Sequence, residues 1–90
     1  MTDKGNPLKQ VVDLLRSHGF DQASEDFQLQ VDRLSSGEKD ERIAAADAIE
    51  QRAHPRWLGD LYIDGLKLQE WWGLLERAAE YAQKAARSMA

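Results

Sequence analysis

The side chains best suited to chemistry in this sequence are two histidines, His18 and His54. Histidine can act as a general acid or base and as a metal ligand. Each histidine is expected at the C-terminal end of a helix, where the helix dipole favours a positive charge. Neither lies in an HExxH motif or a comparable metal-binding spacing. We therefore expect no metal site and no catalytic residue, and we assign both histidines a local role at helix ends.

Paired carboxylates are the other candidates. Glu38 with Glu41, and Asp47 with Glu50, are spaced so that each pair shares one side of a helix. Such a pair can bind a cation or act in acid–base catalysis, but it is also common on the solvated face of any acidic helix. The chain has no cysteine, which excludes thiol catalysis and Cys-based zinc sites. We expect no enzyme and no cofactor.

The charge of the chain is unevenly distributed. The net charge is −4, and the segment 21–50 holds nine acidic and three basic residues. A strongly acidic segment repels phosphate, so direct binding of nucleic acid is not expected. The segment could face a basic protein partner, or it could only keep a small domain soluble. No apolar run reaches the ~18 residues that span a bilayer, and no signal peptide is visible, so we expect a cytoplasmic protein that does not contact the membrane.

Hydrophobic spacing predicts four helices in a single domain. Asn6 and Pro7 form a typical helix start, and Gly19 followed by Phe20 fits a Schellman C-terminus. Asp21 is expected to cap the second helix. The predicted helices cover residues 7–18, 22–35, 38–54 and 68–88, and residues 55–67 form an ordered loop with a short 3₁₀ turn. The fold class is therefore all-α, a four-helix bundle with a Trp-containing loop before the last helix.

The last helix has an expected buried stripe and one unusual residue. The stripe holds Leu68, one of the two adjacent tryptophans, Leu75 and the alanines Ala79, Ala82 and Ala86. Gly73 lies inside this helix, where glycine costs ~1 kcal/mol relative to alanine. A glycine at such a position often marks the close approach of another backbone or of an aromatic ring.

Aromatic residues gather in the stretch HPRWLGDLYIDGLKLQEWW, residues 54–72, which holds all three tryptophans. One interpretation is structural: the indoles form a small core under the loop. The other is recognition, because Trp, Tyr and Arg dominate binding hot spots. Trp71 and Trp72 lie about 100° apart on a helix, so one of them is expected inside and the other half-covered or exposed. Arg56 is expected to stack on Trp57 as a cation–π pair. The two interpretations can both hold, for different rings.

The stretch HPRWLGDL, together with Glu70, Trp71 and Trp72, resembles small bacterial proteins of the immunity or antitoxin type. These proteins are short, acidic and mostly helical, and they neutralise a toxin. The resemblance covers about an eighth of the chain, names no specific family and carries no catalytic residue over. It implies a neutralising protein–protein interaction.

We expect a small acidic protein that inhibits a basic protein partner by occlusion. The residues expected to bind that partner come from the loop, the last helix and the acidic segment: Arg56, Trp57, Asp60, Tyr62, Asp64, Trp72, Glu38, Glu41, Asp47 and Glu50. One alternative is a homodimeric structural or assembly subunit that associates through the alanine-rich third helix and an exposed tryptophan. Another is a phage-encoded inhibitor of a host defence complex. A helix-turn-helix regulator is disfavoured by the acidic charge of the second and third helices.

Overall fold

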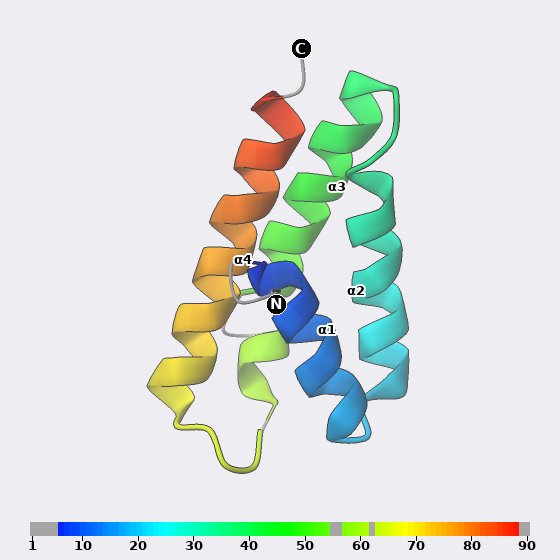
Figure 1. The fold of residues 1–90 in the computed structure, drawn as a ribbon. Coiled ribbons are helices and arrows are strands. Elements are labelled where there is room, and N and C mark those ends of the chain that lie inside the picture. The colour runs from blue at the N-terminus through cyan, green and yellow to red at the C-terminus, as the bar shows by residue number, and fades with distance from the viewer. Residues whose placement is uncertain (1–5, 55–56, 62, 89–90) are drawn as a thin grey trace.

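A computed structural model of the chain describes residues 6–54, 57–61 and 63–88. Within these residues the chain forms four α-helices and one short 3₁₀ helix (Figure 1), so the predicted all-α four-helix bundle is confirmed. The elements are α1 (Pro7–Ser17), α2 (Asp21–Arg33), α3 (Lys39–Arg52), η2 (Leu58–Asp60) and α4 (Leu68–Ser88).

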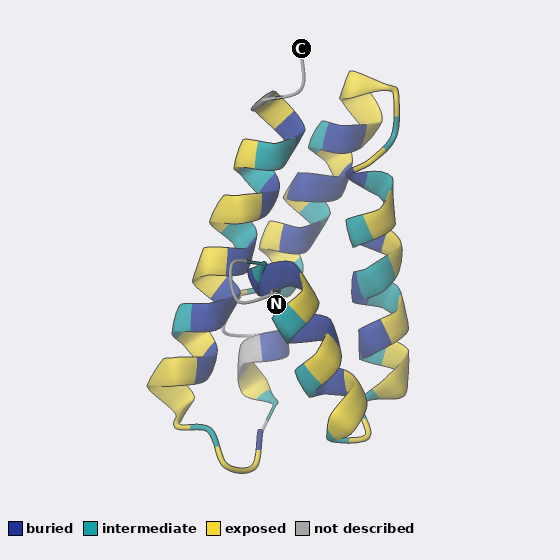
Figure 2. Ribbon diagram, in the orientation of Figure 1, coloured by how far each residue is buried: buried dark blue, intermediate teal, exposed yellow. Residues whose placement is uncertain are grey.

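The helices alternate in direction, and each packs on the next along the chain (Figure 1). Helix α4 closes the bundle by packing against both α1 and α3. Figure 2 shows the buried residues on the sides of the helices that face one another. The largest fully buried side chains come from all parts of the chain: Val11, Leu15, Ser24, Phe27, Ile49, Ile63, Trp71 and Leu75. In the described residues, no helix is both long enough and apolar enough to cross a membrane.

Helix α1 begins and ends as its sequence predicts. The side chain of Asn6 accepts hydrogen bonds from the backbone N–H groups of Leu8 and Lys9, which supplies acceptors for amides that no helical carbonyl can reach. At the other end Gly19 has φ +85°. The N–H of Phe20 bonds the carbonyl of Leu15, and the N–H of Gly19 bonds that of Arg16. These two bonds define a Schellman motif.

The predicted cap of α2 is wrong. Phe20 occupies the N-cap position without a side-chain hydrogen bond, and Asp21 is the first helical residue. Its carboxylate still favours the helix through the dipole. Two polar residues of α2, Ser24 and Gln30, are buried. Both are satisfied: Ser24 donates to the carbonyl of Val12, and Gln30 accepts from Arg33.

The loop before α4 is anchored at two points. The indole N–H of Trp71 donates to the carbonyl of Leu58, with an N···O distance of 2.8 Å. Nε2 of His18 lies 3.0 Å from the carbonyl oxygen of Asp64, and Nδ1 lies 2.8 Å from that of Leu14. His18 therefore links the C-terminus of α1 to the loop. The predicted 3₁₀ turn is present as η2.

Candidate functional site

The three tryptophans divide into one core residue and two surface residues. Trp71 is 1% exposed, whereas Trp72 is 41% and Trp57 is 54% exposed. The expectation that one of Trp71 and Trp72 would be buried and the other half-covered or exposed is confirmed. Successive residues of a helix point about 100° apart, so the two rings face different surroundings. Leu68, expected in the buried stripe of α4, is instead 53% exposed. The structural interpretation therefore holds for Trp71, and Trp57 and Trp72 are available at the surface.

Trp57 lies against an arginine other than the expected one. The guanidinium of Arg52, the last residue of α3, lies 5.3 Å from the centre of the Trp57 ring. Arg52 also forms an ion pair with Asp26 of α2 and donates to the carbonyl of Ala48. Arg56 lies outside the described residues, so its predicted pairing with Trp57 is not described. Because the carboxylate of Asp26 and the carbonyl of Ala48 both hold the guanidinium, Trp57 rests on a side chain that is itself held in place.

Trp72 lines an open groove between α3 and α4. The groove has a volume of about 500 Å³, and its lining comes from the end of α3 and the first half of α4: Glu50, Ala53, His54, Gln69, Trp72, Gly73, Glu76 and Ala79. The two carboxylates stand on opposite helices, and neither lysine nor arginine is among these described lining residues. A larger hollow of about 1070 Å³ continues along α4 toward its C-terminus and shares Glu50, Glu76 and Ala79 with the groove.

Gly73 does not have the close neighbour that its position in a helix suggested. A Cβ placed on this residue would meet only the guanidinium of Arg77, at 3.6 Å, which is ordinary contact. Its backbone does not require glycine either, because its φ is not positive. The glycine is therefore unexplained by the packing of the described residues, and it faces the groove beside Trp72.

The predicted acidic residues fall on two sides of α3. Glu41 accepts from the hydroxyl of Ser36 and lies 3.5 Å from Arg33, so it joins α3 to α2. Glu38 is exposed at the N-cap of α3. The other pair faces α4 instead.

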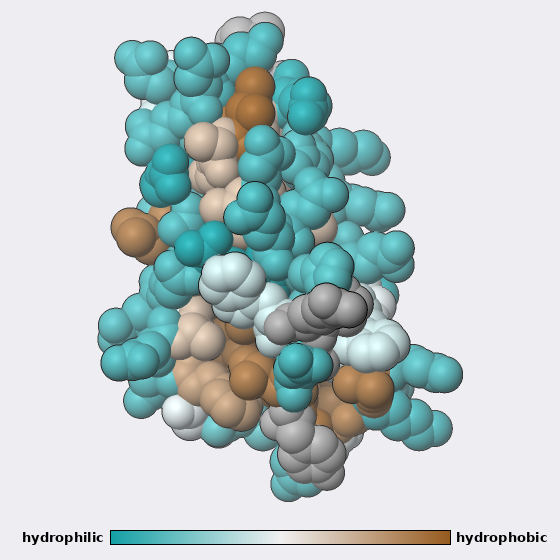
Figure 3. Space-filling view, turned by 180° about the vertical axis from the view of Figure 1, so that it is seen from behind, coloured by the Kyte–Doolittle hydropathy of each residue, from teal (hydrophilic) through white to brown (hydrophobic). Residues whose placement is uncertain are grey.

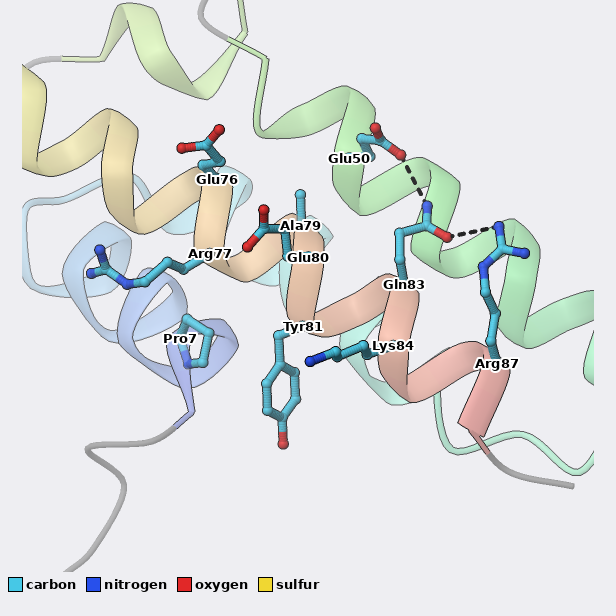
Figure 4. Close-up of a pocket in the computed structure, with 10 residues that line it drawn as sticks. All are labelled: Pro7, Glu50, Glu76, Arg77, Ala79, Glu80, Tyr81, Gln83, Lys84 and Arg87. Atoms are coloured by element: carbon cyan, nitrogen blue, oxygen red, sulfur yellow. Dashed lines mark hydrogen bonds between the residues drawn. The ribbon is translucent and has the colours of Figure 1, made fainter.

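Asp47 and Glu50 both accept hydrogen bonds from the side-chain amide of Gln83, at 3.0 and 2.9 Å. Arg87 donates to the oxygen of that amide, which fixes its orientation. Figure 4 shows Gln83 reaching from α4 to Glu50, with Arg87 on its other side. Of the two acidic pairs, only this one lies next to the groove that holds Trp72.

The remaining predicted site residues belong to the loop. Asp60 and Asp64 are exposed, and Asp64 offers its backbone carbonyl to His18. Tyr62 lies outside the described residues, as Arg56 does.

In the view from behind, apolar and pale side chains gather in the lower half of the molecule, while hydrophilic ones cover most of the upper half (Figure 3).

No group of three or more His, Asp or Glu residues in the described part of the chain could hold a metal ion. Nδ1 of His18 lies 2.8 Å from the carbonyl oxygen of Leu14 and 3.4 Å from the hydroxyl of Ser17, and Nε2 lies 3.0 Å from the carbonyl oxygen of Asp64. What the described residues do present is two exposed indoles at one end of α3. Trp57 rests on the last residue of that helix, and Trp72 shares a groove with the two residues that follow it.

Two contributors to this site were missed from the sequence. Arg52 was overlooked because Arg56 is the immediate neighbour of Trp57. The signal that could have found Arg52 is the proline after His54, since the chain must turn at the end of α3 and bring residue 57 back over residue 52. Gln83 lies 33 residues from Glu50, and no local pattern links them.

No family model, curated protein or solved structure matches the chain. The fold is that of an all-α four-helix bundle, a class that carries no function of its own. The function is therefore argued from the surface around the end of α3.

Proposed function

We propose that this protein binds a basic protein partner and inhibits it by occlusion, as an immunity protein or antitoxin does. The observation that carries the proposal is the pair of exposed indoles, Trp57 and Trp72, at the C-terminal end of α3. Exposed tryptophans with a fixed orientation bury a large area at a small cost in conformational entropy. Arg52 and Asp26 provide that fixed orientation for Trp57.

The charge around the indoles supports a basic partner. Glu50 and Glu76 line the groove of Trp72, and Asp47 adjoins it through Gln83. Complementary charge speeds encounter and suppresses wrong partners. A phage-encoded inhibitor of a host defence complex would use the same surface in the same way, and the identity of the captured partner distinguishes the two.

The homodimer through the third helix has less support. Of the alanines of this helix, Ala45 and Ala46 are fully buried within the chain itself and Ala48 is half-buried, which leaves Ala44 exposed to a second copy. Helix α3 already packs against α2 on one side and α4 on the other.

The test is affinity capture from the native lysate with four versions of the tagged protein. These are the parent, Trp57→Ala, Trp72→Ala and Leu29→Ala, the last being a matched control because Leu29 is an exposed apolar residue on α2. We expect one dominant basic partner that the parent and the control capture and both tryptophan variants lose. The purified partner should then lose its own activity when one equivalent of the parent is added. Equal capture by all four versions, or an active partner in the complex, would contradict the proposal.

A further inference from the structure

We propose that the groove between α3 and α4 seats a cationic helix of the partner, with an arginine or lysine side chain over the indole of Trp72 and the helix backbone close to Gly73. This inference rests on the proposed function and adds the chemistry and the secondary structure of the segment that is bound.

Charge selects a cation for this groove. Its two charged lining residues in the described part of the chain are Glu50 and Glu76, one from each wall. The adjoining hollow holds Glu80 but also Arg77, Lys84 and Arg87, so the excess of acidic charge belongs to the groove itself. The C-terminal end of α3 points at the same place, because Ala53 is its C-cap and lines the groove. A helix C-terminus carries a partial negative charge that attracts cations. The carboxylates and the helix end therefore favour the same ligand charge.

The indole supplies the second contact. A cation above the face of a tryptophan is attracted by the ring quadrupole, and the attraction grows when water is excluded. The chain already makes this contact elsewhere, with Arg52 over Trp57. Trp72 offers a second indole, 41% exposed, within the acidic groove. Glu50 and Glu76 can then accept hydrogen bonds from the same guanidinium or ammonium group.

Small residues between the two helices allow a backbone to approach closely. Ala53, Gly73 and Ala79 carry the smallest side chains of the lining. Gly73 is destabilising inside a helix, and nothing in the described structure packs tightly on it. A partner backbone at this position accounts for the glycine. Because the groove runs between two antiparallel helices, a third helix fits it as helices fit other apolar grooves, with its apolar side inward.

The inference is tested by nitrogen–proton correlation spectra of the protein titrated with two synthetic peptides. Both peptides are alanine-rich helices with the same apolar side, and one carries Lys and Arg where the other carries Glu. The basic peptide should shift the amides of Ala53, Gly73 and Glu76 and the indole N–H of Trp72, and the acidic peptide should not. Shifts centred on Glu38 and Glu41 instead, or no shift with millimolar basic peptide at low salt, overturn the inference.

Two variants with one control locate the contact. Gly73→Leu introduces a good helix former whose side chain fills the groove, and Glu76→Lys reverses the charge on one wall. Each should weaken binding of the basic peptide by roughly tenfold or more. Glu25→Lys, which changes an exposed acid on α2, should have little effect on that binding. Circular dichroism spectra confirm that each variant is folded.

The same variants distinguish this inference from the proposed function. If Trp57→Ala loses the captured partner while Gly73→Leu and Glu76→Lys keep it, the protein binds its partner at the end of α3 and the groove does not take part in binding. If none of the three changes capture, both proposals fail. Light scattering of the protein alone tests whether a second copy of this chain fills the groove instead. A dimer that Gly73→Leu dissociates would mean that a second copy fills the groove, which also overturns the inference.

Discussion

Trp71 and Trp72 follow each other in the chain and face different surroundings. Trp71 fills the core beneath η2 and donates its indole N–H to Leu58. This bond satisfies the one polar atom of a ring that is otherwise buried among apolar side chains. Trp72 leaves its ring in an open groove. The energetic consequences of removing the two rings should therefore differ sharply.

Trp71→Ala should lower the free energy of unfolding by ~3–5 kcal/mol, because it removes a large buried side chain and leaves a cavity. That is a large part of the total for a domain of this size. Trp57→Ala and Trp72→Ala should each cost under ~1 kcal/mol. Urea unfolding followed by circular dichroism measures all three without depending on tryptophan fluorescence. A loss for Trp72→Ala as large as that for Trp71→Ala would place the second ring in the core and remove support for a binding role.

Arg52 should act on binding through Trp57. Arg52→Ala removes the ion pair with Asp26 and the support beneath the ring. We expect it to weaken partner binding, and the double variant with Trp57→Ala should be no weaker than Trp57→Ala alone. Such non-additivity is the sign that two residues work through one contact. Dissociation constants for the parent, the two single variants and the double variant measure it. Fully additive losses would mean that Arg52 contacts the partner directly.

At the scale of the elements, glycine has two different functions in this fold. Gly19 has φ +85° and closes the Schellman motif between α1 and α2. Gly73 sits in α4 with ordinary helical backbone, and a Cβ there would meet only the guanidinium of Arg77, at 3.6 Å. The first is required by the backbone, and the second has no requirement within the described structure. The same substitution at the two positions should therefore have effects of opposite sign.

Gly73→Ala should raise the free energy of unfolding by ~0.5–1 kcal/mol, because alanine is the better helix former and its Cβ meets only Arg77. Gly19→Ala should lower it by ~1–2 kcal/mol, because a left-handed conformation is strained for alanine. Thermal or urea unfolding of the two variants beside the parent checks both signs. A destabilised Gly73→Ala would show that something in the chain does pack against this position.

At the scale of the whole molecule, acidic charge is spread over several surfaces. The carboxylate of Glu41 joins α2 to α3, and those of Asp47 and Glu50 face α4. The segment 21–50 therefore does not form a single acidic face, although it remains strongly acidic. The charge that bears on binding is the part beside the exposed indoles, together with the net charge of −4, which acts at long range.

Association with a basic partner should slow as salt is added, by roughly tenfold or more between low and physiological ionic strength, while dissociation changes little. Stopped-flow mixing of the protein with the captured partner over a series of salt concentrations gives both rate constants. Glu76→Lys should make the dependence on salt shallower. An association rate that does not change with salt would mean that acidic charge has no part in recognition.

The sequence by itself determined the helices and most of their ends. Hydrophobic spacing, the Asn6–Pro7 start and the Gly19–Phe20 stop depend on residues within one or two turns, so local chemistry is enough to identify them. The four helices therefore lie within one to two residues of their predicted ranges. Asp21 is the exception, because a cap also depends on how the chain enters the helix, which here follows the turn at Gly19.

Only the tertiary structure decided which side chains form the candidate site. A rotation of 100° per residue separates a core tryptophan from a surface one, and the neighbours of a helix determine which of the two faces inward. The turn after α3 brings the ring of Trp57 to within 5.3 Å of the guanidinium of Arg52. The packing of α3 on α4 places the amide of Gln83 within hydrogen-bond distance of both Asp47 and Glu50. Asp47 and Glu50 lie 36 and 33 residues from Gln83, so local spacing carries no information about that contact.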